Sequence, residues 1–232
     1  MQLIPVLDLK GGQVVRAQQG RRDRYQPIVT PLAGSADPVR VAEGLRGLHP
    51  FSIFYVADLD AIEGRGSNAS AIARLSEMPG RPQLLVDAGY CDGEALARAL
   101  AVPGLHPVLG SESQKDETLL KRFRDHPNLV LSLDFFADGF RGPRALLESP
   151  EFWPQRLIVM TLAKVGSATG PNLSTLAAIQ AKAGNRSVIA AGGVRNEADL
   201  SQLSSLGIAA ALVATSLHDG TLTPAQIAAF AR

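Results

Sequence analysis

The sequence is poor in cysteine, in net charge and in long apolar runs. Its single cysteine, Cys91, cannot form an internal disulfide, which fits a reducing cytoplasm. The 23 basic and 22 acidic side chains leave a formal net charge of +1, so we expect neither nucleic acid nor an anionic membrane as a partner. No apolar run approaches the roughly 18 residues of a membrane helix, and the first residues do not resemble a signal peptide. These absences predict a cytoplasmic protein.

Cofactor and metal signatures are missing as well. The sequence contains neither the glycine-rich fingerprint of a dinucleotide site nor a P-loop. Its four histidines show no metal-ligand spacing, and neither Ser132 nor Ser216 stands in a nucleophile elbow. We therefore expect no metal and no cofactor. The oligomeric state stays open, and a monomer is compatible with the sequence.

Short apolar, β-branched runs recur along all 232 residues, and such continuous runs are typical of parallel strands that are covered on both faces. The predicted strands are Leu3–Leu7, Ser52–Ala57, Gln83–Val86, His106–Leu109, Leu129–Leu133, Leu157–Met160, Ser187–Ala190 and Ala210–Val213. Stretches with helical apolar spacing separate them, the clearest being Pro38–Leu48, with Ser35 or Asp37 as its N-cap. Eight alternating units predict a single α/β domain over 1–232, a (β/α)8 TIM barrel. A doubly wound open sheet is the alternative.

An internal repeat divides this barrel into two halves. Leu85–Gly89 is similar to Ile189–Gly193, an offset of 104 residues from Gly89 to Gly193. The same offset relates Gly66-Ser67-Asn68 to Gly170-Pro171-Asn172 and Gly110-Ser111 to Ala214-Thr215. Three matches at one offset favour a duplication, with half-barrels at about 1–125 and 126–232.

Two aspartates are the leading catalytic candidates. Asp8 follows the first predicted strand and Asp134 the fifth, so in a ring of eight strands they face each other across the mouth of the barrel. Opposed carboxylates suit a reaction that needs one acid and one base, and we expect both to face the solvent-filled mouth. The alternative is that each aspartate caps a helix or pairs with a basic neighbour.

Small residues after the last two strands predict a phosphate site. Gly192 and Gly193 expose backbone N–H groups before a helix, and Ala214, Thr215 and Ser216 follow the eighth strand. Barrels commonly hold a phosphate between these two turns. The alternative is that the glycines only allow a tight turn.

The repeat places a possible second phosphate site at Gly89, Gly110 and Ser111. Asp87 precedes this turn and Glu112 follows it, and both would repel a phosphate dianion unless they point away. A basic cluster at 21–25, in the long loop after the first strand, is either a solvated face or a cover for an anionic substrate.

These landmarks resemble the ProFAR isomerases of histidine biosynthesis (HisA) and their sister cyclase barrels (HisF). The resemblance runs along the whole chain, and its matching segments are Ile4–Arg16 with Gln19-Gly20 and Tyr25, Asp58–Asp60 with Asn68, Ser132–Asp134, Thr161 with Gly170–Asn172, and Gly192–Val194. The Lys-Gly-Gly-Gln loop at 10–13 and the short chain favour the isomerase side.

The resemblance implies a duplicated half-barrel that performs an aldose–ketose (Amadori) rearrangement without a cofactor, on a substrate with a phosphate at each end. By resemblance, Asp8 is the base, Asp134 is the acid that opens the ribose ring, and Thr161 hydrogen-bonds the reacting ribose. It also places Arg16, Tyr25 and Asp58 in the loops that border the substrate, with a structural role for Asp58 equally open.

Four positions depart from the family pattern. The third-strand turn has Asp87-Ala88-Gly89 in place of Gly-Gly-Gly, and loop five has Gly142-Pro143 in place of Gly-Trp. Loop six has Lys164-Val165-Gly166-Ser167 in place of Arg-Asp-Gly-Thr, and the last turn begins with Ala214-Thr215 in place of Gly-Lys. Three functions therefore stay open: ProFAR isomerisation, a paralogous reaction on another phosphorylated compound, such as a lyase or synthase in cofactor biosynthesis, and non-catalytic binding of a phosphorylated ligand.

Overall fold

The structure is a computed structural model that describes residues 1–18, 20–166 and 170–230. Within these ranges, eight parallel strands form a closed barrel, because β11 pairs with β1 as well as with β10. In chain order the barrel strands are β1 (Gln2–Lys10), β4 (Ile53–Asp58), β5 (Gln83–Asp87), β6 (Leu105–Gly110), β7 (Val130–Phe136), β9 (Arg156–Thr161), β10 (Ser187–Ala191) and β11 (Ala210–Val213). Each predicted strand overlaps one of these. The predicted barrel is confirmed, and the closure excludes the open sheet.

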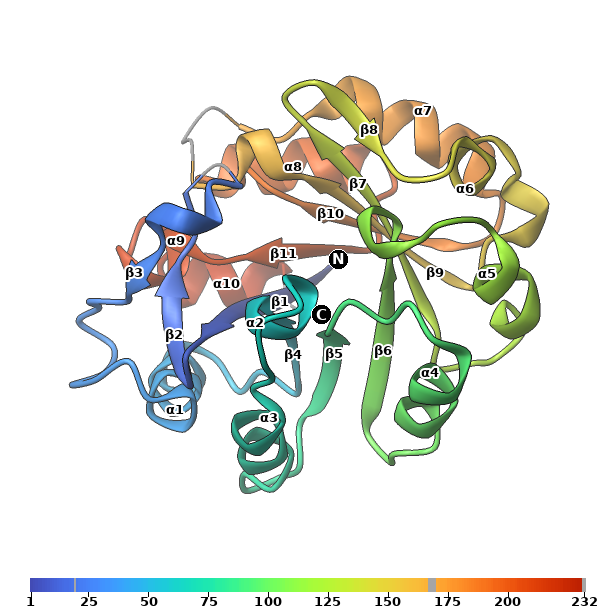
Figure 1. Cartoon of the computed structure of the whole chain (residues 1–232). Coiled ribbons are helices and arrows are strands. Elements are labelled where there is room, and N and C mark those ends of the chain that lie inside the picture. The colour runs from blue at the N-terminus through green and yellow to red at the C-terminus, as the bar shows by residue number, and fades with distance from the viewer. Residues whose placement is uncertain (19, 167–169, 231–232) are drawn as a thin grey trace.

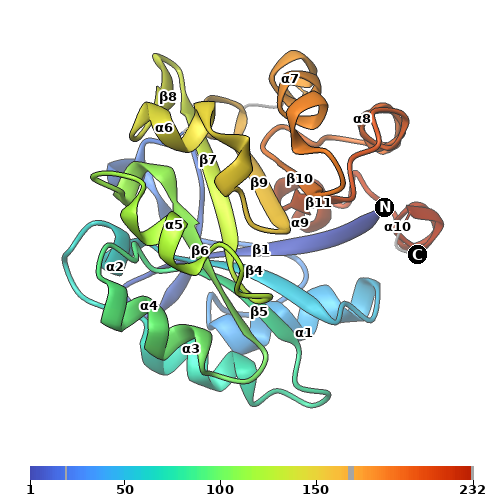
Figure 2. The same cartoon turned by 90° about the vertical axis from the view of Figure 1, so that its right-hand side faces the viewer.

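Helices surround the strands on the outside, as Figures 1 and 2 show from two sides. The α-helices are α1 (Pro38–Leu48), α2 (Leu59–Ile62), α3 (Ala69–Ser76), α4 (Gly93–Leu100), α5 (Thr118–Phe123), α6 (Arg144–Glu148), α7 (Leu173–Ala183), α8 (Glu197–Ser205), α9 (Thr215–His218) and α10 (Pro224–Phe230). Single 3-10 turns are η1 (Arg22–Arg24), η2 (Ser111–Ser113), η3 (Pro150–Phe152) and η4 (Leu162–Lys164). No helix in the described part of the chain has the length and apolar character needed to span a membrane.

Two apolar layers hold the barrel together. The inner layer fills the ring with side chains from every barrel strand, among them Ile4, Tyr55, Leu85, Val108, Val130, Ile158, Ile189 and Leu212. The outer layer lies between strands and helices, and the alternate strand residues, such as Leu7, Val86 and Leu133, belong to it. Because both faces of each strand are buried, the strands read as continuous apolar runs in the sequence.

Polar N-caps start several of the helices. Asp37 accepts hydrogen bonds from the N–H groups of Val39 and Arg40 at the start of α1, as expected. Asp92 caps α4 and Asn196 caps α8, each through the N–H three residues on. These two caps are separated by the repeat offset of 104, so the duplicated pattern extends to the helix starts.

Three short strands are absent from the sequence-based prediction. β2 (Gln13–Arg16) runs antiparallel to β1, with β3 (Gln26–Pro27) beside it, and β8 (Gly139–Arg141) runs antiparallel to β7. Asp8 pairs with Val15, and Asp134 pairs with Arg141, so each aspartate faces a residue seven positions further along the chain. The first and the fifth barrel strands therefore each continue into a hairpin at the carboxyl end of the barrel.

Candidate active site

A cavity of about 270 Å³ lies at the carboxyl ends of the barrel strands. Its floor is apolar, with Tyr55, Met160 and Leu212 from the inner core layer. Its charged lining includes Asp8, Asp87, Glu112 and Asp134, together with Arg16, Arg22, Lys164 and Arg195. This is the end of a (β/α)8 barrel where strand-end side chains converge.

Asp8 and Asp134 both line this cavity. They come from β1 and β7, the first and fifth strands of the ring, which stand opposite each other. The expected juxtaposition across the mouth is therefore present. The expectation that both face open solvent is wrong for Asp134, whose side chain is only 3% exposed.

Four hydrogen bonds hold Asp134 in its buried position, three of them to its carboxylate. Ser132 Oγ donates to Oδ1 at 2.6 Å, and the N–H of Glu112 donates to Oδ2 at 3.1 Å. Ser111 Oγ lies 3.1 Å from Oδ2, and the N–H of Asp134 itself donates to Ser111 Oγ at 2.9 Å. Burial raises the pKa of Asp134 to about 6, and the hydrogen bonds from Ser132 and Glu112 limit the rise. The carboxyl is thus held in a fixed orientation and titrates close to neutral pH.

The environment of Asp8 gives it a pKa close to neutrality as well. Burial raises the pKa of Asp8 to about 7, and the Arg22 guanidinium opposes the rise. Tyr25 lies in the same electrostatic environment, where burial and the charge of Asp8 raise the pKa of its phenol to about 12. Two carboxyl groups on opposite strands therefore titrate where proton donors and acceptors are most effective.

The residues of the first predicted phosphate site lie together, after β10 and β11. Gly192, Gly193, Ala214, Thr215 and Ser216 all line the cavity. Gly192 has φ 102° and Gly193 has φ 87°, and a Cβ on Gly193 would lie 2.4 Å from the carbonyl oxygen of Gly170, so only glycine fits this turn. Thr215 and Ser216 begin α9, where N–H groups have no partner within the helix and suit the binding of an anion.

The second predicted phosphate site contains the protein's own carboxylates. Gly89 donates its N–H to Asp87 Oδ1 at 3.0 Å. Gly110 lies against the same carboxylate, because a Cβ there would stand 3.0 Å from Asp87 Oδ2. Ser111 is fully buried and uses its hydroxyl to hold Asp134 and the carbonyl oxygen of Arg141. The groups that the repeat assigns to a second phosphate are thus engaged in other contacts.

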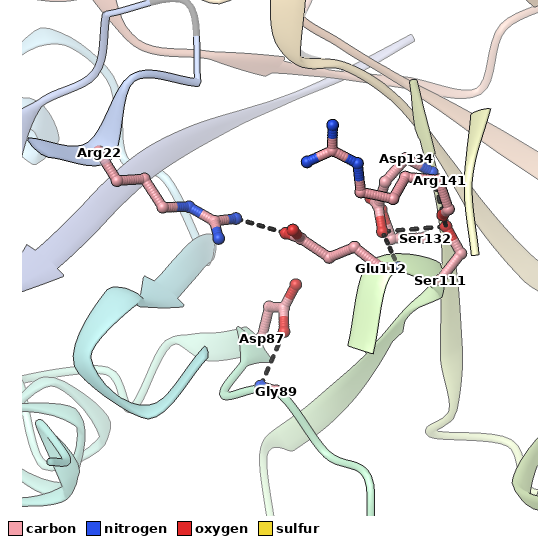
Figure 3. Close-up of polar contacts among 8 residues, drawn as sticks. All are labelled: Arg22, Asp87, Gly89, Ser111, Glu112, Ser132, Asp134 and Arg141. Carbon is pink, nitrogen blue, oxygen red and sulfur yellow. Dashed lines mark hydrogen bonds and ion pairs between the residues drawn. The ribbon is translucent and has the colours of Figure 1, made fainter. Parts of the chain in front are cut away.

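An ion pair crosses the cavity beside this turn. Arg22, on η1, contacts Glu112, on η2, 90 residues further along the chain. Figure 3 shows Arg22, Asp87 and Glu112 pointing toward one another from three different elements. Glu112 raises the pKa of Arg22, as does Asp87, so the guanidinium stays charged in spite of its burial. Asp87 and Glu112 point into the cavity and do not turn away from it.

Comparison with known proteins identifies the family. A family model described as "Histidine biosynthesis protein" matches residues 2–223. The chain belongs to this family. An uncharacterised protein of Methanocaldococcus jannaschii is 31% identical over 231 residues, which are 98% of this chain and 97% of that relative.

Named relatives in this family are isomerases. Phosphoribosyl isomerase A of Mycobacteroides abscessus is 30% identical, over 98% of both chains. A protein of Nitrosopumilus maritimus named 1-(5-phosphoribosyl)-5-((5-phosphoribosylamino)methylideneamino)imidazole-4-carboxamide isomerase is 30% identical, over 96% of both chains. The resemblance to the ProFAR isomerases noted in the sequence is therefore confirmed at the level of the family.

Some of the other residues that the family resemblance singles out line the cavity, and others do not. Arg16, at the end of β2, and Tyr25 line the cavity, as expected for residues that border a substrate. Asp58 does not, within the described part of the chain: it is 1% exposed, caps α2 through the N–H of Ala61 and accepts two hydrogen bonds from Asn68. Of its two open roles, the contacts of Asp58 support the structural one.

Thr161 ends β9 and is 4% exposed. The described cavity lining contains Met160 and Leu162 on either side of it but not Thr161 itself. Its contact with a ribose stays a prediction. Gln19 and Ser167, which belong to the family comparison, lie outside the described residues.

Sequence reasoning did not anticipate the pairing of Arg22 with Glu112. Each residue belongs to a feature noted in the sequence: Arg22 lies in the basic cluster at 21–25, and Glu112 follows the turn at Gly110 and Ser111. What the sequence does not contain is the path of η1 across the mouth of the barrel, where Lys10 Nζ donates to the carbonyl oxygen of Arg22 at 2.7 Å and holds this loop.

Proposed function

We propose that the chain is an isomerase that performs an aldose–ketose (Amadori) rearrangement on a phosphorylated ribosylamine by acid–base catalysis. The observation that carries the proposal is the pair formed by Asp8 and Asp134, two carboxyl groups of raised pKa on opposite strands of one cavity. The glycine turn of β10 and the start of α9, in the same cavity, suit one phosphate of the substrate.

The chemistry requires one acid and one base, and its atoms balance without a cofactor. The acid protonates the ring oxygen as the C1–O bond breaks, and the nitrogen lone pair forms the C=N bond of an iminium ion. The base then removes the proton from C2, which gives an enolamine. Protonation at C1 and loss of the hydroxyl proton at C2 give the ketose. We assign the acid role to Asp134, whose carboxyl is fixed by hydrogen bonds, and the base role to Asp8.

The ProFAR-type substrate is the first to test, because relatives that span nearly the whole chain are named as isomerases of that compound class. The experiment is complementation of a histidine auxotroph that lacks ProFAR isomerase, supported by a turnover assay of the purified protein. Growth that is lost in Asp8→Asn and in Asp134→Asn supports this function. A wild-type chain that is expressed and folded but neither complements nor turns over the compound contradicts ProFAR as the substrate.

A paralogous reaction on a different phosphorylated substrate is the second candidate. The observation that favours it is the contact between Asp87 and the N–H of Gly89, the donor that a second phosphate would use. A substrate with a single phosphate would avoid this carboxylate. The same acid–base pair would then act on another aldosylamine.

A further inference from the structure

The cavity has opposite chemical character at its two ends. On the β10 and β11 side the lining offers glycine turns and the start of α9, which suit an anion. On the β5, β6 and β7 side it offers the carboxylates of Asp87, Glu112 and Asp134. A substrate that spans the cavity therefore meets donors at one end and acceptors at the other.

Asp87 is the central group of the acidic end. Its side chain is 6% exposed, and Oδ1 accepts the Gly89 N–H. Within the part of the chain that the structure describes, no hydrogen-bond donor contacts Oδ2, although the residue lines the cavity. Because Asp87 lines the cavity, a ligand there can donate a hydrogen bond to Oδ2. A phosphate dianion would add repulsion in place of a hydrogen bond.

The Arg22 side chain shows that the acidic end of the cavity accommodates a cation. The Arg22 guanidinium contacts Glu112, and its charge lowers the pKa of Asp87 against the effects of burial and of Asp134. Arg22 belongs to the loop that Lys10 ties down at the rim, so its guanidinium reaches the acidic end from outside. A ligand cation placed between Asp87 and Glu112 would make the same pairing and would also donate a hydrogen bond to Asp87 Oδ2.

We propose that the substrate carries a phosphate at one end only and a cationic nitrogen group, an ammonium or amidinium, at the other, where Asp87 and Glu112 bind it. The inference rests on the second candidate function, in which the substrate has a single phosphate, and on the proposed phosphate site at β10 and β11. It separates this chain from family members that act on a compound with two phosphates. Charge-assisted hydrogen bonds of this kind contribute enough to discriminate ligands by about tenfold or more.

The test is a binding experiment that requires no turnover. Isothermal titration of the purified full chain compares a series of aminoalkyl phosphates of graded length with alkyl phosphates and alkane bisphosphates of the same lengths. For the best length, we expect the aminoalkyl phosphate to bind about tenfold more tightly than the neutral alkyl phosphate. We expect the bisphosphate to bind less tightly than either.

Substitutions of single residues test which side chains cause the preference for the aminoalkyl phosphate. Asp87→Asn and Glu112→Gln should each remove most of the preference for the amine while leaving the affinity for the alkyl phosphate within about twofold. Asp138→Asn, at an exposed carboxylate on the β7–β8 turn, is the matched control and should retain the preference. If one of these two variants does not fold, the other still tests the preference for the amine.

Three outcomes overturn the proposal. Equal affinity for amino and neutral phosphates overturns it and leaves the phosphate site and the acid–base pair intact. Tighter binding of the bisphosphate overturns it and assigns Arg22 to a second phosphate. Binding of none of the phosphates overturns it together with the phosphate site, whereas turnover that depends on Asp8 and Asp134 would still support the isomerase.

Discussion

Ser111 and Asp134 hold each other from adjacent strands, β6 and β7. The N–H of Asp134 donates to Ser111 Oγ at 2.9 Å, and the same hydroxyl lies 3.1 Å from Asp134 Oδ2 and 2.7 Å from the carbonyl oxygen of Arg141. Because Ser111 is fully buried, these contacts fix the carboxyl against rotation. The residue that the repeat assigns to a phosphate thus positions the proposed acid.

Removing this hydroxyl should misplace the acid without removing it. Ser111→Ala leaves the N–H of Asp134 without its acceptor, so we expect a loss of about 1–3 kcal/mol in the free energy of unfolding, measured with urea. We also expect kcat to fall while KM changes little. Ser205→Ala, at an exposed helical serine, is the control. A kcat equal to that of the wild type in the Ser111 variant would show that Asp134 does not depend on this contact.

Each of the two opposed aspartates should be needed for turnover. Asp8→Asn and Asp134→Asn should each lower kcat by about 10²-fold or more, because a positioned acid or base contributes roughly 10²–10⁴-fold. Circular dichroism checks that both variants fold. Asp134→Asn should be the less stable of the two, since Asp134 is buried among donors and Asp8 is only half-buried. Wild-type turnover in either variant would exclude the opposed-carboxylate mechanism.

Asp87 should make the protein less stable as the pH rises. Burial and the charge of Asp134 raise the pKa of Asp87 to about 7 from a model-compound value of 3.8, so the folded chain holds this proton more tightly than the unfolded chain does. Its contribution is therefore fully present below pH ~4 and is lost as the pH rises to about 7.

Asp87→Asn should remove this loss. The stability of the variant relative to the wild type should increase by roughly 4 kcal/mol between pH ~4 and pH ~8, measured by urea unfolding across the range. A pH slope should remain in the variant, because the pKa values of Asp8 and Asp134 are also raised. The same slope in both proteins would show that Asp87 ionises normally in the fold.

An anion should bind between the β10 turn and the start of α9. A sulfate or phosphate ion soaked into crystals should contact the N–H groups around Gly193 and Thr215, while the Gly89 turn should stay empty because Asp87 accepts its N–H. Thr215→Asp should abolish phosphate binding in solution by placing a carboxylate in the site. Thr223→Asp adds the same charge before α10 and should bind phosphate as the wild type does. An anion found only at Gly89 would reverse the assignment.

The sequence by itself determined the barrel and the strand ends at which the candidate residues stand. Apolar runs covered on both faces, helical stretches between them and a repeat at one offset specify eight βα units, so Asp8 and Asp134 had to stand on opposite strands. The N-cap of α1 was also readable, as Ser35 or Asp37, because a cap depends only on residues within one helical turn. The glycines at 192 and 193 marked the tight turn after β10 for the same local reason.

Only the tertiary structure decided what the acidic residues do. Asp58 and Asp87 both end a barrel strand, yet Asp58 turns to the N–H groups of Ala61 and Asn68 while Asp87 faces the cavity. The meeting of Arg22 with Glu112 spans 90 residues and depends on the path of a loop across the barrel mouth. Such contacts follow from packing between distant segments, and no local pattern of residue types encodes them. For this reason the strand ends could be read from the sequence, but the charge that each one presents to a ligand could not.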